Sequence, residues 1–132
     1  MNPLVQQRTL PIIDPVSTTL LSAEIARLPA DANLISLGDF QVFSASAASM
    51  PGVMQEIGRL RETAFRDVGE GTGKALDLDA HDAHYQHLFV WNHVTHEVVG
   101  AYRLGFTREL IDQHGVTGLY THSLFEFDTA LF

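Results

Sequence analysis

The chain has 132 residues, enough for one domain with a modest core, and it carries 16 acidic residues against 8 basic ones. The net charge of −8 argues against unspecific nucleic-acid binding, which requires clustered lysine and arginine. Cysteine is absent, which excludes disulfides, thiolate catalysis and cysteine-based zinc sites. The sequence shows neither a signal peptide nor an apolar run of about 18–20 residues, so we expect a cytoplasmic protein.

The first third of the chain predicts an arm followed by a short helix. Residues 1–19 contain three of the five prolines and no sustained hydrophobic period. The stretch "STTLLSAEIARLP" offers an N-cap at Ser17 or Thr18 and apolar residues at helical spacing, ending before Pro29. We therefore separate an N-terminal arm with a short helix, residues 1–39, from the main domain, residues 40–132.

The main domain begins with a strand and an amphipathic helix. "FQVFSAS", residues 40–46, alternates enough to predict a strand. A helix is predicted over residues 51–68, because Pro51 suits a first-turn position and Gly69 a C-cap. Its apolar residues recur at steps of three and four, with Arg59, Arg61, Glu62 and Arg66 between them: Val53, Ile57, Leu60, Ala64 and Phe65.

The second half predicts a long loop and a hairpin. "GEGTGKALDLDAHD" is a loop of about fourteen residues, a length that suggests function. "AHYQHLFVWN" and "EVVGAYRLGF" predict paired strands across the turn "HVTH". "TRELIDQHG" then predicts a short helix and "VTGLYTHSLFEF" a last strand. This order indicates an α/β layered domain with a mainly antiparallel sheet.

Two simple site types do not fit the loop. "VGEGTGK" resembles a phosphate-binding loop, but Gly69 and Gly73 enclose three residues instead of four, and Ala75 replaces the magnesium-binding Ser or Thr. The three histidines at positions 81, 84 and 87 point to opposite faces if the strand begins near His84. The aspartates also lack the glycine and closing glutamate of a calcium loop. We expect no metal site, and a metal-dependent hydrolase remains the weakest alternative.

Two arginines stand next to apolar patterns. Arg61 lies one helical turn before Phe65, and Arg103 lies inside the apolar strand "VVGAYRLGF". Each is either on a solvated face or paired with an acid. The loop aspartates Asp77 and Asp79, with Asp82, are natural partners, and we expect each arginine to lie within ion-pair distance of one of the three.

These residues form an ordered set that resembles a known family. "RETAF", then "DLDAHD", then the arginine of "VGAYRL" is similar to the acyl-homoserine-lactone synthases. The stretches "LRETAFRDVGEGTGKALDLDAHDAHYQHLFVWN" and "EVVGAYRLG" resemble more closely the bacterial GNAT-like N-acyltransferases of ornithine-lipid synthesis, often called hemolysin-like. The resemblance covers residues 40–128, and it rests on the order of the motifs more than on any single one.

The resemblance implies a GNAT-like three-layer α/β fold and transfer of a long-chain acyl group to an amine such as ornithine. The acyl donor would be a thioester of acyl carrier protein or coenzyme A, with no tightly bound cofactor or metal. Carried over by position, the catalytic set is Arg61, Asp79, Asp82 and Arg103. Phe65 and Asp77 correspond to substrate-binding positions. A homo-oligomer, with peripheral contact to the inner membrane surface, is expected.

One departure affects the activity expected of this chain. In the family the chain continues past "SLFEFD" into a strand with a Glu/Arg pair and the donor-binding turn and helix. We therefore expect an incomplete GNAT-like domain that alone transfers acyl groups poorly and self-associates through its uncovered sheet. The alternative is a non-catalytic interaction or regulatory module that retains half of the fold.

Overall fold

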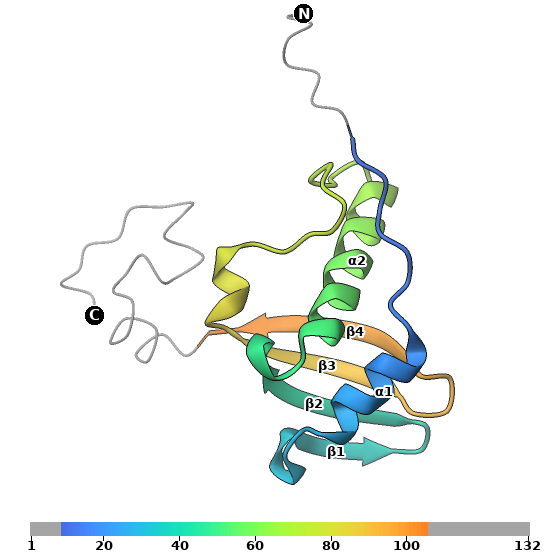
Figure 1. Cartoon of the computed structure of the whole chain (residues 1–132), viewed down its shortest axis with the longest axis vertical. Helices are drawn as coiled ribbons and strands as arrows, with labels where there is room; N and C mark the ends of the chain where they lie inside the picture. The colour runs from blue at the N-terminus through green and yellow to red at the C-terminus, as the bar shows by residue number, and fades with distance from the viewer. Residues whose placement is uncertain (1–8, 106–132) are drawn as a thin grey trace, which may run out of the picture.

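The computed structural model describes residues 9–105, which form an antiparallel sheet covered on one face by helices. Figure 1 shows α1 and α2 crossing the same face of the sheet. The mixed α/β class and the antiparallel sheet are thus confirmed. The sheet order is β1-β2-β3-β4, with β1 Asn33–Leu37, β2 Phe40–Ser46, β3 Gln86–Asn92 and β4 Glu97–Leu104.

The core lies between the sheet and the two helices. On β3, every second residue is buried, as expected for a strand with one covered face. Phe89 pairs with Phe43 across β2 and β3, and their rings stack at 5.4 Å between centroids. These rings belong to the same buried cluster as Val53 and Ile57 of α2 and Leu21 of α1. This packing fixes α2 over the sheet and so sets the position of its last turns.

Helix α2 (Pro51–Asp67) confirms the predicted amphipathic helix. Pro51 occupies the first turn, where its missing N–H costs no hydrogen bond. The helix ends because Gly69 adopts a positive φ of 77°, a conformation that glycine takes without steric cost. The Gly69 and Glu70 amides then donate back to Arg66 (3.0 Å) and Phe65 (2.8 Å), which closes the helix in a Schellman motif.

The start of α2 is capped by a side chain from another helix. Its N-cap residue, Met50, makes no side-chain cap. Instead, Glu24 of α1 (Thr18–Ala26) accepts hydrogen bonds from the amides of Gly52 (2.7 Å) and Val53 (2.9 Å). A carboxylate at this end also interacts favourably with the helix dipole. Helix α1 therefore supports the helix that carries the site residues.

We expect Glu24→Ala to lower the free energy of unfolding by about 1–2 kcal/mol, because two amides at the N-terminus of α2 lose their acceptor. Urea unfolding followed by circular dichroism measures this change. Glu70→Ala is the matched control, since Glu70 is exposed and its side chain holds no helix end. Equal stability of the two variants would contradict the role of Glu24 as a cap.

Strand β1 was not among the predicted elements, so the region before residue 40 holds a strand in addition to the arm and the helix. Leu34, Ile35 and Leu37 are all exposed on this edge strand. Apolar and polar residues therefore do not alternate along its sequence. The pairing Leu37↔Phe40 nevertheless leaves a two-residue turn, Gly38–Asp39. A Gly-Asp pair between apolar residues is a hairpin signal that would have revealed the strand.

The hairpin of β3 and β4 is confirmed, but the predicted first strand starts too early. Residues 80–83 form a 3-10 turn, Ala80–Ala83, and β3 begins at Gln86. Asp79 caps this turn with its side chain, a local preference of aspartate that competes with extended structure. The predicted helix at 107–115 and strand at 116–127 lie outside the described residues.

The sheet face opposite the helices carries apolar side chains. By strand alternation, this face includes exposed residues of β1, β2 and β4: Ile35, Leu37, Phe40, Tyr102 and Leu104. The third layer of the expected three-layer arrangement is not found within residues 9–105. Among those residues, none of the helices is long and apolar enough to cross a bilayer.

Candidate active site

The predicted site residues come from four segments of the chain that meet at one end of the sheet: α2, the loop after it, a 3-10 turn and β4. Helix α2 supplies Arg61 and Phe65 on its last turns. The loop after α2 supplies two aspartates and the 3-10 turn a third, Asp82. Strand β4 supplies Arg103, whose backbone lies opposite His87 of β3 in the strand register. The loop can approach α2 because Gly58 has no side chain: its carbonyl accepts from Asp77 N at 2.9 Å, and a Cβ there would lie 2.7 Å from Leu78.

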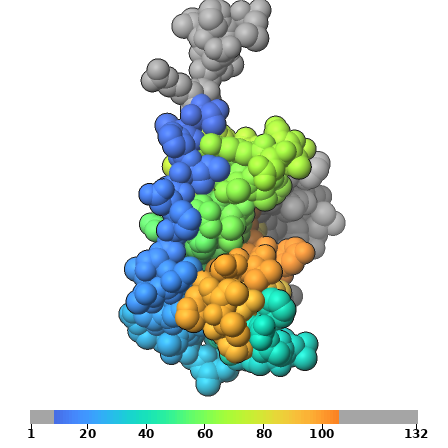
Figure 2. Space-filling model, turned by 90° about the vertical axis from the view of Figure 1, so that its right-hand side faces the viewer, coloured from blue at the N-terminus to red at the C-terminus, as the bar shows by residue number. Residues whose placement is uncertain are grey.

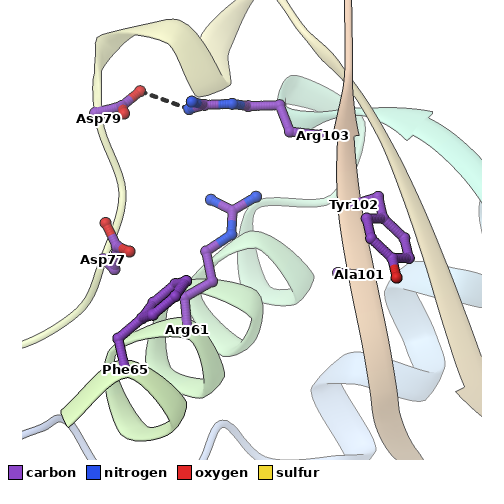
Figure 3. Close-up of a pocket in the computed structure, with 7 residues that line it drawn as sticks. All are labelled: Arg61, Phe65, Asp77, Asp79, Ala101, Tyr102 and Arg103. Carbon is purple, nitrogen blue, oxygen red and sulfur yellow. Dashed lines mark hydrogen bonds and ion pairs between the residues drawn. The ribbon is translucent and has the colours of Figure 1, made fainter. Parts of the chain in front are cut away.

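The two arginines are paired with the aspartates. Arg61 Nη1 donates to Asp82 Oδ1 at 3.0 Å. Arg103 Nη1 donates to Asp79 Oδ1 at 2.8 Å and lies 3.3 Å from Asp82 Oδ1. The predicted ion pairing is therefore confirmed, and Figure 3 shows the Arg103–Asp79 pair spanning from β4 to the loop. The functional roles assigned to these residues stay predictions.

Asp82 is the centre of this network. It is 5% exposed, and its Oδ2 accepts from the Asp79 amide at 2.8 Å while its Oδ1 faces both arginines. Burial by itself raises the pKa of Asp82. The Asp79 amide and Arg61, with the charge of Arg103, outweigh that effect and hold the pKa below its ordinary value. Asp82 therefore stays ionised and joins α2, the 3-10 turn and β4.

A pocket of about 270 Å³ opens above the ion pairs. Five of the six predicted site residues line it (Figure 3), whereas Asp82 is not among the lining residues. Within residues 9–105, Asp77 forms no ion pair, whereas Asp79 and Asp82 do. The pocket thus presents two guanidinium groups and one aspartate that has no counter-ion from the described part of the chain. The lining residues are Arg61, Phe65, Asp77, Asp79, Ala101, Tyr102 and Arg103.

A second, apolar pocket adjoins the first. It has a volume of about 360 Å³, lies between α2 and β4, and shares Arg61, Phe65 and Ala101 with the polar pocket. The exposed ring of Phe65 stands at the boundary between the two. A bound molecule with a charged end and an apolar end would find both environments side by side. The remaining lining residues are Ile57, Leu60, Ala64, Val99 and Gly100.

Sequence reasoning missed three residues around the network. Glu62, assigned to the polar face of α2, is fully buried; its spacing of four from Gly58 and eight from Met54 was the available signal. His87 is also fully buried, and its Nε2 lies 2.9 Å from the carbonyl oxygen of Asp82. The Arg103 guanidinium stacks over the ring of Tyr85, 5.2 Å from its centroid. No sequence pattern indicated this last contact.

The histidines do not form a metal site in the described structure. The prediction that strand alternation separates the three histidines was wrong for His81 and His84, because both precede the strand, which begins at Gln86. The ring centroids of His81 and His84 are 5.7 Å apart. His87 is held apart from them because it lies on β3 and points into the core. Within residues 9–105, no three histidine, aspartate or glutamate side chains are placed to hold a metal ion together.

We expect stability to fall as the pH drops below about 6.5, in part through His87. Burial lowers the pKa of His87 below its ordinary value of 6.5, assisted by the charges of Arg61 and Arg103 and opposed by Asp82. Between the two pKa values the unfolded chain therefore binds a proton that the folded chain does not. The stabilisation from neutral His87 is fully present above pH 6.5 and is lost as the pH falls toward the lower pKa of the folded chain. Urea unfolding between pH 7.5 and 5 measures how steeply the free energy of unfolding changes with pH. The contribution of His87 to this slope corresponds to about one bound proton at most. His87→Gln should flatten it, and an unchanged slope would contradict the assignment.

Comparison with known proteins gives a family and two relatives. A family model described as "Acetyltransferase (GNAT) domain" matches residues 60–132. A glycine N(alpha)-acyltransferase from Phocaeicola vulgatus is 39% identical over 122 residues, which cover 88% of this chain and 36% of that protein. A protein of the same name from Bacteroides thetaiotaomicron is 40% identical over 124 residues, covering 90% and 36%. No solved structure matches significantly.

The family match includes the main positions of the site. The matched region begins at Leu60 and so contains both arginines, all three aspartates and strands β3 and β4. The antiparallel sheet with helices on one face agrees with part of such a fold. The chain spans just over a third of the length of the two relatives. On the family match, this chain belongs to the acetyltransferase (GNAT) domain family.

Proposed function

We propose that this chain contributes the amine-binding site of an N-acyltransferase that transfers a long-chain acyl group from a thioester to the α-amine of glycine. The observation that carries the proposal is the pocket in which Asp77 faces Arg61 and Arg103 (Figure 3). The family and the names of the two relatives support the reaction type. The acyl donor would be acyl-CoA or an acyl carrier protein.

The charges of the pocket suit a small amino acid. Glycine presents one carboxylate and one ammonium group in its zwitterionic form. Arginine is well suited to binding a carboxylate, because its planar guanidinium can donate two parallel hydrogen bonds. Asp77 can accept from the ammonium, since no cation among residues 9–105 is paired with it. The pocket therefore offers both complementary charges, with Asp77 on the loop and the two arginines on α2 and β4.

Ornithine, the acceptor implied by the sequence resemblance, is the alternative substrate. It carries a second ammonium group, which would need a second free carboxylate near the first. In this pocket Asp79 is already paired with Arg103, and the buried Asp82 faces both arginines. The charges thus favour glycine, in agreement with the names of the relatives.

The reaction needs a proton acceptor and a stabilised oxyanion. One proton leaves the ammonium, the free amine attacks the thioester carbonyl, and the C–N bond forms as the C–S bond breaks. The thiolate leaves and takes up a proton, and the nitrogen loses a second proton to give the amide. Asp77, which lines the pocket, would receive the first proton directly or through a water molecule. Hydrogen-bond donors must face the developing oxyanion.

The apolar pocket supports a long-chain donor. It shares Arg61, Phe65 and Ala101 with the amine pocket and is lined otherwise by aliphatic groups. Burial of a methylene contributes about 0.8 kcal/mol, so even a few carbons of an acyl chain would bind favourably there. An acyl chain in this pocket would bring its thioester toward Phe65, at the boundary of the two pockets.

The test is acyl transfer to competing amines, measured by mass spectrometry. This chain, and a hybrid in which it replaces the matched segment of the Bacteroides thetaiotaomicron relative, would each receive a long-chain acyl-CoA or acyl carrier protein with equal glycine and ornithine. We expect N-acylglycine from the hybrid, its loss in Arg103→Ala, and little product from this chain alone. Preferential N-acylornithine would overturn the glycine assignment. A folded hybrid without any N-acyl product would favour the non-catalytic interaction module.

Self-association is a further part of this proposal. β4 is an edge of the described sheet, and the face opposite the helices exposes Phe40, Tyr102 and Leu104. Uncovered apolar sheet surfaces and open strand edges favour association between chains. Sedimentation equilibrium of this chain would test the expected homo-oligomer, and a monomer at micromolar concentration would contradict it.

A further inference from the structure

A second buried acid on α2 binds the loop that follows the helix. Glu62 is fully buried, and its carboxylate accepts from the Thr72 amide (2.9 Å), the Thr72 hydroxyl (2.5 Å) and the Gly73 amide (3.1 Å). Arg66 Nε donates to the same group at 2.6 Å. The three loop donors belong to the "GEGTGK" stretch, which has no role in the proposed chemistry. Glu62 thus connects α2 to a loop that begins where the helix ends.

An ionised carboxylate is the group that satisfies all of these donors. The Thr72 hydroxyl, against the opposing effect of burial, lowers the pKa of Glu62 to about 2, and Arg66 and the amides of Thr72 and Gly73 add to this. Both carboxylate oxygens are used, Oε1 by Thr72 and Oε2 by Arg66 and Gly73. A glutamine would offer one acceptor oxygen and an NH₂ group that faces donors.

The anchored loop leads directly into the wall of the polar pocket. Arg66 also donates to the Lys74 carbonyl (2.8 Å), and Lys74 Nζ to the Leu78 carbonyl (3.1 Å). The Asp77 amide donates to Gly58 of α2. Residues 72–78 are therefore fixed at both ends and in the middle. Asp77 lies four residues after Gly73, the second of the two loop residues that Glu62 binds.

The N-terminal segment packs on the outer side of the same loop. The amides of Leu10 and Ile13 donate to the carbonyls of Gly73 (2.8 Å) and Ala75 (3.0 Å). Figure 2 shows this blue segment lying beside the yellow-green end of α2 and its loop. The loop thus lies between the segment and α2, and on the helix side Glu62 accepts the hydrogen bonds of Thr72 and Gly73.

We propose that Glu62 is a positioning residue for the pocket: its carboxylate fixes the loop over residues 72–79 so that Asp77 and Asp79 face Arg61 and Arg103. The structural part of this inference stands without the proposed function. Its consequence for glycine binding rests on that function. Glu62 acts through the loop and does not line the pocket itself.

The test compares Glu62→Gln with Glu56→Gln by amide hydrogen exchange in this chain. Glu56 is a matched control, because it is also a buried α2 glutamate paired with an arginine, but it accepts from Val16 N instead of the loop. We expect exchange at Thr72, Gly73 and Asp77 to rise about tenfold or more in Glu62→Gln and to stay unchanged in Glu56→Gln. Unchanged exchange at Asp77 in Glu62→Gln would overturn the inference.

Kinetics of the hybrid separate this inference from the proposed function. Glu62→Gln should raise the KM for glycine at least about tenfold and leave the KM for the acyl thioester unchanged. An equal increase in the KM for glycine and the KM for the acyl thioester would overturn a positioning role. An inactive wild-type hybrid would contradict the proposed function, while the exchange measurement would still decide the role of Glu62. If Glu62→Gln fails to fold, Thr72→Val, which removes one loop donor, should raise exchange at the same three amides, and unchanged exchange would overturn the inference.

Discussion

Asp82→Ala is expected to lower the free energy of unfolding by about 3–5 kcal/mol, because it leaves two arginines near a buried site without their shared carboxylate. Arg61 and Arg103 both face Asp82 Oδ1, and the Asp79 amide loses its acceptor as well. Urea unfolding with linear extrapolation measures the change. We therefore expect Asp82 to contribute more to stability than any other member of the pocket network.

Asp77→Ala is the control for this prediction. Asp77 lies five residues before Asp82 and lines the pocket beside the network, but it forms no ion pair within residues 9–105. Its replacement should change the free energy of unfolding by no more than about 0.5 kcal/mol, because it breaks no ion pair in the described part of the chain. A loss for Asp82→Ala as small as that for Asp77→Ala would show that the network contributes little to stability.

Asp77→Asn is expected to raise the KM for glycine about 10- to 100-fold in the hybrid enzyme, with the same stability as the wild type. A hydrogen bond to a charged group contributes about 1.5–3 kcal/mol, and each 1.4 kcal/mol corresponds to a factor of ten in affinity. Asparagine keeps the shape of the side chain and removes the charge that would bind the ammonium. Steady-state kinetics with varied glycine measures the effect.

Asp31→Asn provides the control for Asp77→Asn. Asp31 is exposed and precedes β1, at the opposite edge of the sheet from β4. The same change in charge at that position should leave the KM for glycine unchanged. If Asp31→Asn raised the KM as much as Asp77→Asn, a general effect of net charge would explain both, and Asp77 would have no direct contact with the amine.

Much of the fold followed from patterns that are local in the sequence. Helix α2 was predictable because its apolar residues recur at helical spacing between Pro51 and Gly69, and the β3–β4 hairpin because two apolar strands flank a short polar turn. β1 was missed because an exposed edge strand needs no alternation, as Leu34 and Leu37 show. Capping by Asp79 displaced the start of β3, since a local side-chain hydrogen bond competed with strand formation.

The site was predictable in part. The pairing of Arg61 and Arg103 with aspartates followed from charges next to apolar patterns, which need partners when the chain folds. The burial of Glu62 and His87 did not follow, because it depends on which distant segment covers them. Glu62 is covered by a loop ten residues away, and His87 lies on the buried face of β3, where its ring contacts the carbonyl of Asp82. Helical spacing from Met54 and Gly58 indicated the side of α2 on which Glu62 lies, but it did not indicate that a loop covers it, because such coverage is a property of the tertiary fold.

The most direct test of the central claim is an NMR titration of this chain with glycine and with N-acetylglycine, which lacks the ammonium group. The signals to follow are the Asp77 carboxylate carbon and the Arg61 and Arg103 Nε–H groups. Glycine should shift all three saturably. N-acetylglycine should shift the arginine signals and leave Asp77 unchanged. Glycine that moves none of them, or N-acetylglycine that shifts Asp77 as strongly as glycine does, would contradict an amine site in this pocket.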